Sequence, residues 1–312
     1  MEIIKVTSKE YEQVIGKHIH VFQNVSFNEL NRDKCDELLF FLFKEGKYKL
    51  GIILGVKDSS LYSPFSAPFG GFSFLSSNVK LSYIENAIKE LKNWAKVNGF
   101  SSVNITLPPD IYEPGLVSKQ VNCLWREGFE MSEIDLNYAL HLNSFDNNYL
   151  QNIQYNARKN LKVALKSDLE FVKCSDPEEK EQAYDVIKKN REQRGFPLRM
   201  TWKQVKETTN IIDADFFLLK HEDNIPVASA VVFHVAPEIV QVIYWGDIHE
   251  YSHLRTMNML SFKVFEYYKN KNIKIVDIGP STENSVPNYG LAEFKESIGC
   301  TVSTKFKFVY KF

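Results

Sequence analysis

The same arrangement of strand and helix patterns occurs twice along this chain of 312 residues. Residues 40–44 (FFLFK) align with residues 216–220 (FFLLK), and each run is followed by an apolar segment, an aromatic stretch with a glycine, and an amphipathic helix. Each half then has a buried-type strand that ends at a proline, near residues 103–108 and 275–280. A repeat of this size indicates a duplicated domain, because solenoid repeats are roughly 20 to 50 residues long. We therefore expect the differences between the halves to locate the function.

Length and composition favour an ordinary globular protein with two domains. The chain is 44% hydrophobic and 25% charged, which is typical of a folded, water-soluble chain. At roughly 150 residues per domain, the repeat predicts domains at residues 1–145 and 146–312. The net charge of -1 provides no overall field that favours nucleic acid or an anionic membrane. DNA is therefore not an expected partner, and any anion recognition must come from local basic clusters.

The cysteines and the apolar runs bear on metal binding and location. Cys35, Cys123, Cys174 and Cys300 are widely scattered, and no pair has the spacing of a metal site or a redox motif. No metal site is therefore predicted, and free thiols in a reducing compartment are expected. The longest apolar run, residues 38–43, is far shorter than the roughly 20 residues of a membrane span. The chain also starts without a signal peptide pattern, so a cytoplasmic location without a transmembrane segment is expected.

Periodicity predicts the same order of elements in both halves, most clearly in the second. Alternating and continuous apolar runs predict strands, and apolar residues at spacings of three and four predict helices. Asp176 before Pro177 and Thr201 before Trp202 are predicted helix N-caps. In the second half we expect strands at 169–173, 215–220, 227–235, 239–245, 273–278 and 301–312, and helices at 177–194, 202–211, 256–270 and 291–298. Residues 147–165 between the halves are predicted to form a basic helix. The order predicts an α/β (α+β) fold in which each domain has a mixed central sheet flanked by helices.

Three segments of the second half add a resemblance to a known family. They are residues 156–164 (NARKNLKVA), the sequence Trp245-Gly246-Asp247 with the residues that follow it, and residues 290–299 (GLAEFKESIG). The first is similar to a basic R-N-I-x-K-A helix, and the last to a G-L-x-x-F-K-x-x-F-G motif. In this order they resemble the Fem-type transferases, tandem GNAT-like proteins that attach amino acids to peptidoglycan precursors. The resemblance implies two tandem GNAT-like (acyl-CoA N-acyltransferase) domains and an N-acyltransferase activity.

The resemblance leaves two acyl donors open. GNAT enzymes that use acyl-CoA usually carry a glycine-containing loop at the start of the long helix, where backbone amides bind the pyrophosphate. Residues 249–258 occupy this place and contain no glycine, which argues against CoA. The small size, the near-zero charge and the missing helical arm argue against aminoacyl-tRNA. We take acyl-CoA (acetyl-CoA) as the nominal donor and aminoacyl-tRNA as the alternative. The candidates for donor binding are Tyr244, Trp245, Arg255, Thr256 and Asn258.

Lys295 and Asp277 are the first catalytic candidates. The resemblance implies that Lys295 faces the donor or the developing oxyanion, while the alternative is a solvated lysine on an amphipathic helix. Asp277 lies inside an apolar strand, where a carboxylate is unexpected unless it is paired, hydrogen-bonded or functional. It is a candidate base for the incoming amine or a candidate to bind its ammonium form, or else a structural partner of an arginine or a backbone amide. The aligned residue of the first half is Ile105, which favours catalysis in the second domain and a degenerate, supporting first domain.

The remaining candidates surround the predicted acceptor site. Glu283 is an alternative base, unless it is simply a mobile loop carboxylate, and Tyr289 is a candidate general acid at the start of the last helix. The candidates for acceptor binding are Arg158, Lys162, Arg194, Arg199 and Ser281. The resemblance implies a small-molecule or peptide amine as acceptor, with cell-wall precursors among the candidates. The rival hypothesis is a catalytically inactive tandem-GNAT protein that binds a peptide or a cell-wall fragment.

Overall fold

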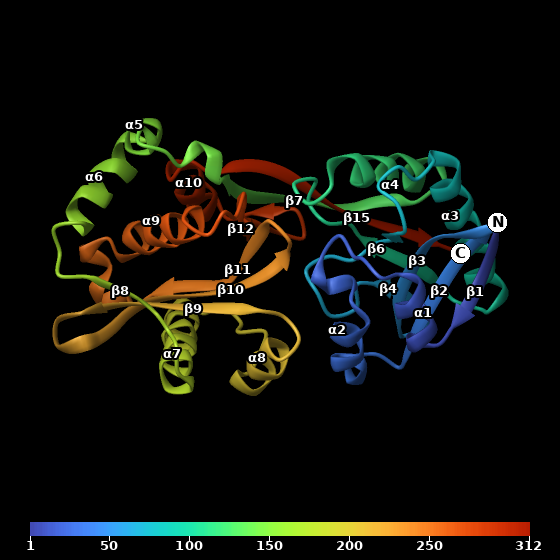
Figure 1. The fold of residues 1–312 in the computed structure, drawn as a ribbon, viewed down its shortest axis with the longest axis horizontal. Helices are drawn as coiled ribbons and strands as arrows, with labels where there is room; N and C mark the ends of the chain where they lie inside the picture. Colours follow the sequence, from blue (N-terminus) through green and yellow to red (C-terminus); the bar gives the residue numbers. More distant parts are fainter. The chain divides into compact units, whose positions relative to one another are not determined.

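The computed structural model describes all 312 residues, Met1–Phe312. Their contacts divide the chain into two compact units. The first unit consists of Met1–Leu136, Asn284–Val286 and Ser303–Phe312, and the second of Asn137–Glu283 and Pro287–Val302. In each unit a twisted sheet is flanked by helices (Figure 1). No helix has the length and apolar character needed to cross a membrane.

The first unit is built on strands in the order β1-β2-β3-β4-β6-β15, with β5 beside β3. Its elements are β1 (Glu2–Val6), α1 (Ser8–Val14), α2 (Val25–Leu30), β2 (Glu37–Glu45), β3 (Lys47–Lys57), β4 (Ser60–Ser63), β5 (Ser73–Phe74), α3 (Leu81–Val97), β6 (Ser102–Thr106), α4 (Pro114–Arg126) and the start of β7 (Glu130–His141). Alternate residues of β2 and β3, such as Phe41 and Ile52, pack with α3 and α4 in one apolar core. The two-residue period of the strands therefore matches the predicted pattern.

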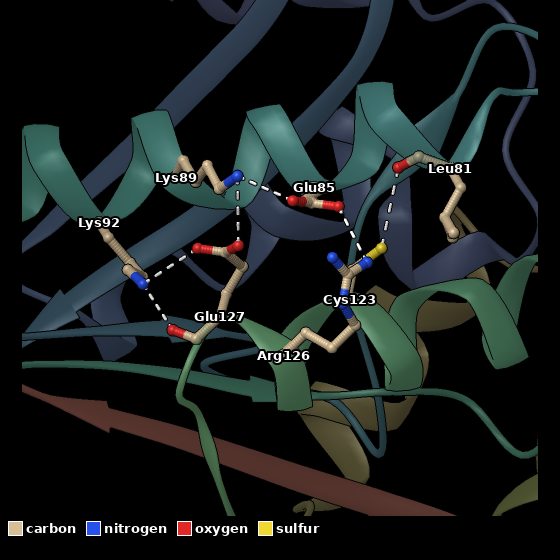
Figure 2. Close-up of polar contacts among 7 residues, drawn as sticks. All are labelled: Leu81, Glu85, Lys89, Lys92, Cys123, Arg126 and Glu127. Carbon is tan, nitrogen blue, oxygen red and sulfur yellow. Dashed lines mark hydrogen bonds and ion pairs between the residues drawn. The ribbon is translucent and has the colours of Figure 1, made fainter.

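The outer surfaces of α3 and α4 are joined by ion pairs between side chains (Figure 2). Glu85 accepts hydrogen bonds from Lys89 at 2.8 Å and from Arg126 at 3.0 Å. Glu127 lies 3.3 Å from Lys92 and 3.5 Å from Lys89. Lys89 and Arg126 are exposed, while Glu85, Glu127 and Lys92 are half-buried. Ion pairs at a protein surface contribute about 0–1 kcal/mol each, so the network adds little to the stability of the fold.

The second unit repeats this strand order as β8-β9-β10-β11-β12. Its elements are α5 (Tyr149–Asn152), α6 (Tyr155–Ala164), β8 (Glu170–Lys173), α7 (Pro177–Arg194), α8 (Trp202–Thr209), β9 (Ala214–His221), β10 (Ile225–Ala236), β11 (Ile239–Asp247), the 3-10 helix η5 (His249–Leu254), α9 (Thr256–Lys269), β12 (Ile275–Pro280), β13 (Thr282–Glu283), β14 (Val286–Pro287), α10 (Tyr289–Ser297) and β15 (Thr301–Lys311), of which β14 and β15 belong only in part to this unit. The predicted caps are confirmed, since Asp176 accepts from the Glu179 amide and Thr201 from the Gln204 amide.

Each sheet is completed by a strand from the other half of the sequence. Phe308 of β15 lies opposite Ile105 of β6 in an antiparallel ladder, and residues 137–141 of β7 pair with β12. These ladders satisfy the second edges of β6 and β12, which would otherwise expose unpaired backbone groups. Each unit therefore includes a strand segment from the other half of the sequence, so that the units exchange their last strands.

Two predicted elements differ from the structure in informative ways. Residues 147–165 form the two helices α5 and α6 rather than one helix, because Ile153 is extended and the Gln154 amide donates to the Ser297 carbonyl. The last helix begins at Tyr289 rather than at residue 291, because the Asn288 side chain caps it by accepting from the Leu291 amide. Both differences arise from single hydrogen bonds that periodicity does not report.

Candidate active site

The centre of the second unit contains a pair of parallel strands that separate. The ladder between β11 and β12 ends at the pair Gln241–Asp277, although β11 continues to Asp247 and β12 to Pro280. In open α/β sheets, ligands bind beyond the carboxyl ends of parallel strands, at places where neighbouring strands part. We call this place the ladder end.

Asp277 lies at the ladder end and is fully buried. Its Oδ1 accepts hydrogen bonds from Asn137 Nδ2 and from the Gly279 amide, each at 2.8 Å. Its Oδ2 accepts from Gln241 Nε2 at 2.8 Å. Because a buried carboxylate is stabilised by such donors, the geometry supports the alternative of a structural partner to amides. The role of Asp277 as the base for the incoming amine remains a prediction.

Lys295 projects from α10 into the same region and is only 1% exposed. Its Nζ donates to the carbonyl oxygens of Gly279 and Pro280, both at 2.9 Å, and lies 5.5 Å from the centre of the Tyr138 ring. The alternative of a solvated lysine is therefore wrong. Burial lowers the pKa of Lys295 to about 7, against the opposing attraction of the Asp277 carboxylate. The amine thus changes charge near neutral pH.

Two buried polar atoms near the ladder end have no hydrogen-bond partner, Gln241 Oε1 and Ser281 Oγ. Gln241 is 4% exposed and Ser281, the first residue after β12, is 3% exposed. Buried polar side-chain atoms nearly always have a partner. Unused hydrogen-bonding capacity at the carboxyl end of β12 is what a site for a polar ligand requires.

The other two catalytic candidates lie at the surface. Glu283 forms an exposed ion pair with Arg199 at 2.6 Å, so the structure brings these two predicted residues together. The Tyr289 side chain is 73% exposed at the first turn of α10. The Lys295 amine donates to Gly279 and Pro280 and not to either of these side chains. Their predicted acid–base roles remain predictions.

The donor candidates lie along β11 and at the start of α9. Tyr244 and Trp245 are buried, and the Trp245 ring meets Phe294, the neighbour of Lys295, edge to face at 6.2 Å. Burial raises the pKa of the Tyr244 phenol. Arg255 is exposed and has a left-handed backbone with φ of 58°. Asn258, three residues after Arg255, is half-buried.

Asp247 is a residue that sequence reasoning missed, although it belongs to the Trp-Gly-Asp motif. Its Oδ2 accepts from the buried Thr256 hydroxyl at 2.7 Å, and its Oδ1 from Arg194 at 3.4 Å. Its backbone carbonyl accepts from Asn190 Nδ2 at 2.7 Å. The end of β11 is thereby fixed to α7 and α9. The motif was the available signal, but it gave no indication of these partners.

Gly246 is required because α7 passes close to it. A Cβ atom at this position would lie 2.6 Å from both Cγ and Oδ1 of Asn190. We expect Gly246→Ala to lower the free energy of unfolding by roughly 1–3 kcal/mol through overpacking, measured by urea denaturation. The matched control is Gly115→Ala in α4, where nothing lies within 4 Å and a small gain in stability is expected. Equal stabilities of the two variants would contradict the close approach of α7.

The two remaining acceptor candidates lie on α6. Arg158 is half-buried and donates to the Leu150 carbonyl at 3.4 Å, while Lys162 is exposed. Their predicted roles in acceptor binding remain predictions. No group of three or more His, Cys, Asp or Glu side chains is arranged to hold a metal ion.

The first unit is closed at the place that corresponds to the ladder end. Its parallel strands β4 and β6 occupy the positions of β11 and β12 in the strand order. The chain after β4 returns across their ends, where the Gly70 amide donates to the Thr106 carbonyl at 2.8 Å and the Gly71 amide to Ser63 Oγ at 3.1 Å. In the second unit the residues after β11 instead lead through η5 into α9. The aligned positions Ile105 and Asp277 therefore differ in surroundings as well as in residue type.

The strand order that the two units share and the parallel strands β11 and β12, which separate, show that the chain has a tandem GNAT-like fold, as predicted. Among solved structures it is similar to FemX, with a TM-score of 0.71 at 16% identity over 100% of this chain and 98% of FemX. L-PGS from Bacillus licheniformis gives a TM-score of 0.63 at 13% identity over 98% and 92% of the two chains. A tandem GNAT protein from the clavulanic acid biosynthesis pathway gives 0.56 at 10% identity over 99% and 98%. No protein-family model and no curated sequence matches the chain.

Proposed function

We propose that the chain is an N-acyltransferase that moves an acyl or aminoacyl group from a thioester or ester donor to an amine by direct attack. The fold similarity to FemX and to a tandem GNAT protein supports the class of reaction. The observation that carries the proposal is the ladder end. There a buried lysine holds the end of β12, and two buried polar atoms have no partner.

In the proposed reaction the amine nitrogen bonds to the acyl carbon, and the C–S or C–O bond of the donor breaks. The proton released by the amine goes to the departing thiolate or alkoxide. Ser281 Oγ is the group we place against the substrate, because its hydrogen bond is unused within the protein. Lys295 acts as a positioning residue, since its bonds to Gly279 and Pro280 set the backbone that leads into Ser281. Positioning of this kind supplies a large share of the rate in acyl transfer.

For the donor we propose acyl-CoA, first acetyl-CoA, with aminoacyl-tRNA as the alternative. For the acceptor we propose a small-molecule or peptide amine, and the resemblance to Fem-type transferases adds cell-wall precursors to these. We place the reaction in the second unit, because the corresponding position of the first unit is closed by residues 70–71.

Ser281→Ala separates catalysis from folding. The variant removes a hydroxyl that has no partner in the protein, so the free energy of unfolding should stay within about 0.5 kcal/mol of the wild-type value. If Ser281 contacts the substrate, kcat/KM for transfer should fall by about tenfold. Steady-state transfer rates and urea denaturation of the same preparations measure both quantities. Unchanged kcat/KM in a variant of unchanged stability would overturn the role of Ser281.

A binding protein without catalysis is the second candidate function. It is favoured by the contacts of the two predicted catalytic residues. Lys295 and Asp277 form their hydrogen bonds with neighbouring groups of the protein. Thermal-shift measurements with acetyl-CoA, longer acyl-CoAs, aminoacyl-tRNA and aminopeptides distinguish the two, because a ligand raises the apparent stability by mass action. Stabilisation by a peptide alone, with no effect of any donor, would favour the binding protein.

A further inference from the structure

One face of α6 carries a row of exposed cations. Lys159 and Lys162 lie three residues apart on α6 and share one side of the helix. Lys166 follows in the turn after the helix ends at Ala164, and all three lysines are exposed. Tyr155, 69% exposed, lies four residues before Lys159 and continues the row. We call these four residues the α6 stripe. The opposite side of the helix is buried, through residues such as Leu161.

The α6 stripe itself contains no acidic residue, and the next one in the chain is Asp168, two residues after Lys166. Residues 147–167 contain these three lysines and Arg158 but no aspartate or glutamate. None of the stripe lysines takes part in an ion pair, whereas Lys89, Lys92 and Arg126 on α3 and α4 are each held by a glutamate (Figure 2). Lys159 and Lys162 lie about 5 Å apart along the helix at 1.5 Å per residue, within the Debye length of roughly 8–10 Å at physiological salt. Their fields therefore add at the surface.

Exposed apolar side chains flank the α6 stripe. Val163 is 43% and Leu165 44% exposed. Leu165 also lines an open hollow of about 480 Å³, together with Leu169, Phe171 and Met259. Figure 1 shows α6 on the outer side of α9, so this part of the second unit faces outward. Cations beside exposed aliphatic groups are the composition of helices that lie in a membrane interface.

We propose that the α6 stripe docks the protein on an anionic phospholipid surface. The three lysines would lie at the phosphate groups, while Val163 and Leu165 enter the boundary between headgroups and acyl chains. Each lysine near an anionic surface contributes about 1 kcal/mol to the free energy of binding, so binding requires several lysines together. Because these attractions are screened by ions, binding should weaken as the salt concentration rises. The two aliphatic flanks favour lipid, because Val163 and Leu165 gain burial there, whereas on a nucleic acid only Tyr155 of this surface would stack on a base. Such docking would bring the protein to amines or acyl groups at a membrane, independently of the reaction proposed above.

Vesicle sedimentation with the full chain tests this proposal. The anionic vesicles contain phosphatidylglycerol and phosphatidylcholine in a ratio of about 3:7, on the order of the anionic content of a charged leaflet. The neutral vesicles contain phosphatidylcholine alone. The charge-reversed variant Lys159→Glu/Lys162→Glu/Lys166→Glu should bind anionic vesicles at least about tenfold more weakly than wild type. The control Lys96→Glu/Lys188→Glu/Lys203→Glu changes the net charge equally at exposed lysines elsewhere, and it should retain most of the binding. Val163→Ser/Leu165→Ser should also weaken binding while leaving the charge unchanged, and circular dichroism shows whether each variant is folded.

Three results would overturn the proposal. The first is wild-type protein that does not sediment with anionic vesicles at low salt. The second is equal loss of binding in the α6 variant and the control, which would indicate a response to net charge alone. The third is binding of bulk tRNA, but not of vesicles, that is lost in the α6 variant, because the stripe would then be a nucleic-acid surface.

Discussion

Replacing Asp277 by alanine is expected to lower the free energy of unfolding by about 3–5 kcal/mol, which is the usual effect of removing one partner from a buried ionic network. The variant would leave the amides of Asn137, Gln241 and Gly279 without their acceptor, all in a fully buried position. It would also remove the carboxylate that attracts the Lys295 amine. Urea denaturation at neutral pH measures the change directly.

Asp185→Ala is the matched control for this variant. Asp185 is exposed on α7, so its replacement should change stability by no more than about 0.5 kcal/mol. A loss below about 1 kcal/mol for Asp277→Ala would mean that the network at the ladder end does not hold the end of β12 in place.

Lys295→Met is expected to remove a distinctive dependence of stability on pH. Burial lowers the pKa of Lys295 from 10.5 to about 7 in the folded protein. Below pH 7 the amine is protonated in both states, and between about pH 7 and 10.5 only the unfolded chain keeps the proton. The unfolded state then binds more protons, so the stability of the wild-type protein rises with pH across this window, by on the order of 4 kcal/mol. Methionine has no such proton to lose.

Denaturation of both proteins at several pH values between 6.5 and 10, roughly the window that the shift defines, measures this effect. The difference in unfolding free energy between wild type and Lys295→Met should rise in favour of wild type as the pH increases. Parallel curves would show that Lys295 is not buried as described. The two hydrogen bonds to Gly279 and Pro280 persist in this account, because a neutral amine still has two N–H groups to donate.

The repeat in the sequence predicted the strand order of both units, but not the exchange of their last strands. Periodicity shows that residues 301–312 form a strand, and says nothing about the edge that this strand joins. Beside β6 it buries Phe308 within the apolar core of the first unit. Such a pairing depends on contacts between distant residues, which no local pattern records.

The same reason limits what the sequence could say about the site. A carboxylate inside an apolar strand pointed to Asp277, and the resemblance pointed to Lys295. The partners of Asp277, however, are Asn137 and Gln241, which lie 140 and 36 residues away in the chain. Gly246 was visible as part of a motif, but glycine is required there because Asn190 of α7 approaches it closely. Ser281 was an acceptor candidate from the sequence, but its burial and its unused hydroxyl are visible only in the structure.

Transfer of a radiolabelled acyl group tests the central claim most directly. Wild-type protein is incubated with labelled acetyl-CoA or with labelled aminoacyl-tRNA and a panel of primary amines and aminopeptides, and N-acylated product is quantified. We predict product over several turnovers from at least one donor, and about tenfold less at equal time with Ser281→Ala. Absence of product with both donors, in a preparation that binds one of the amines, would contradict the account and leave a tandem GNAT-like protein that binds its ligand without transferring an acyl group.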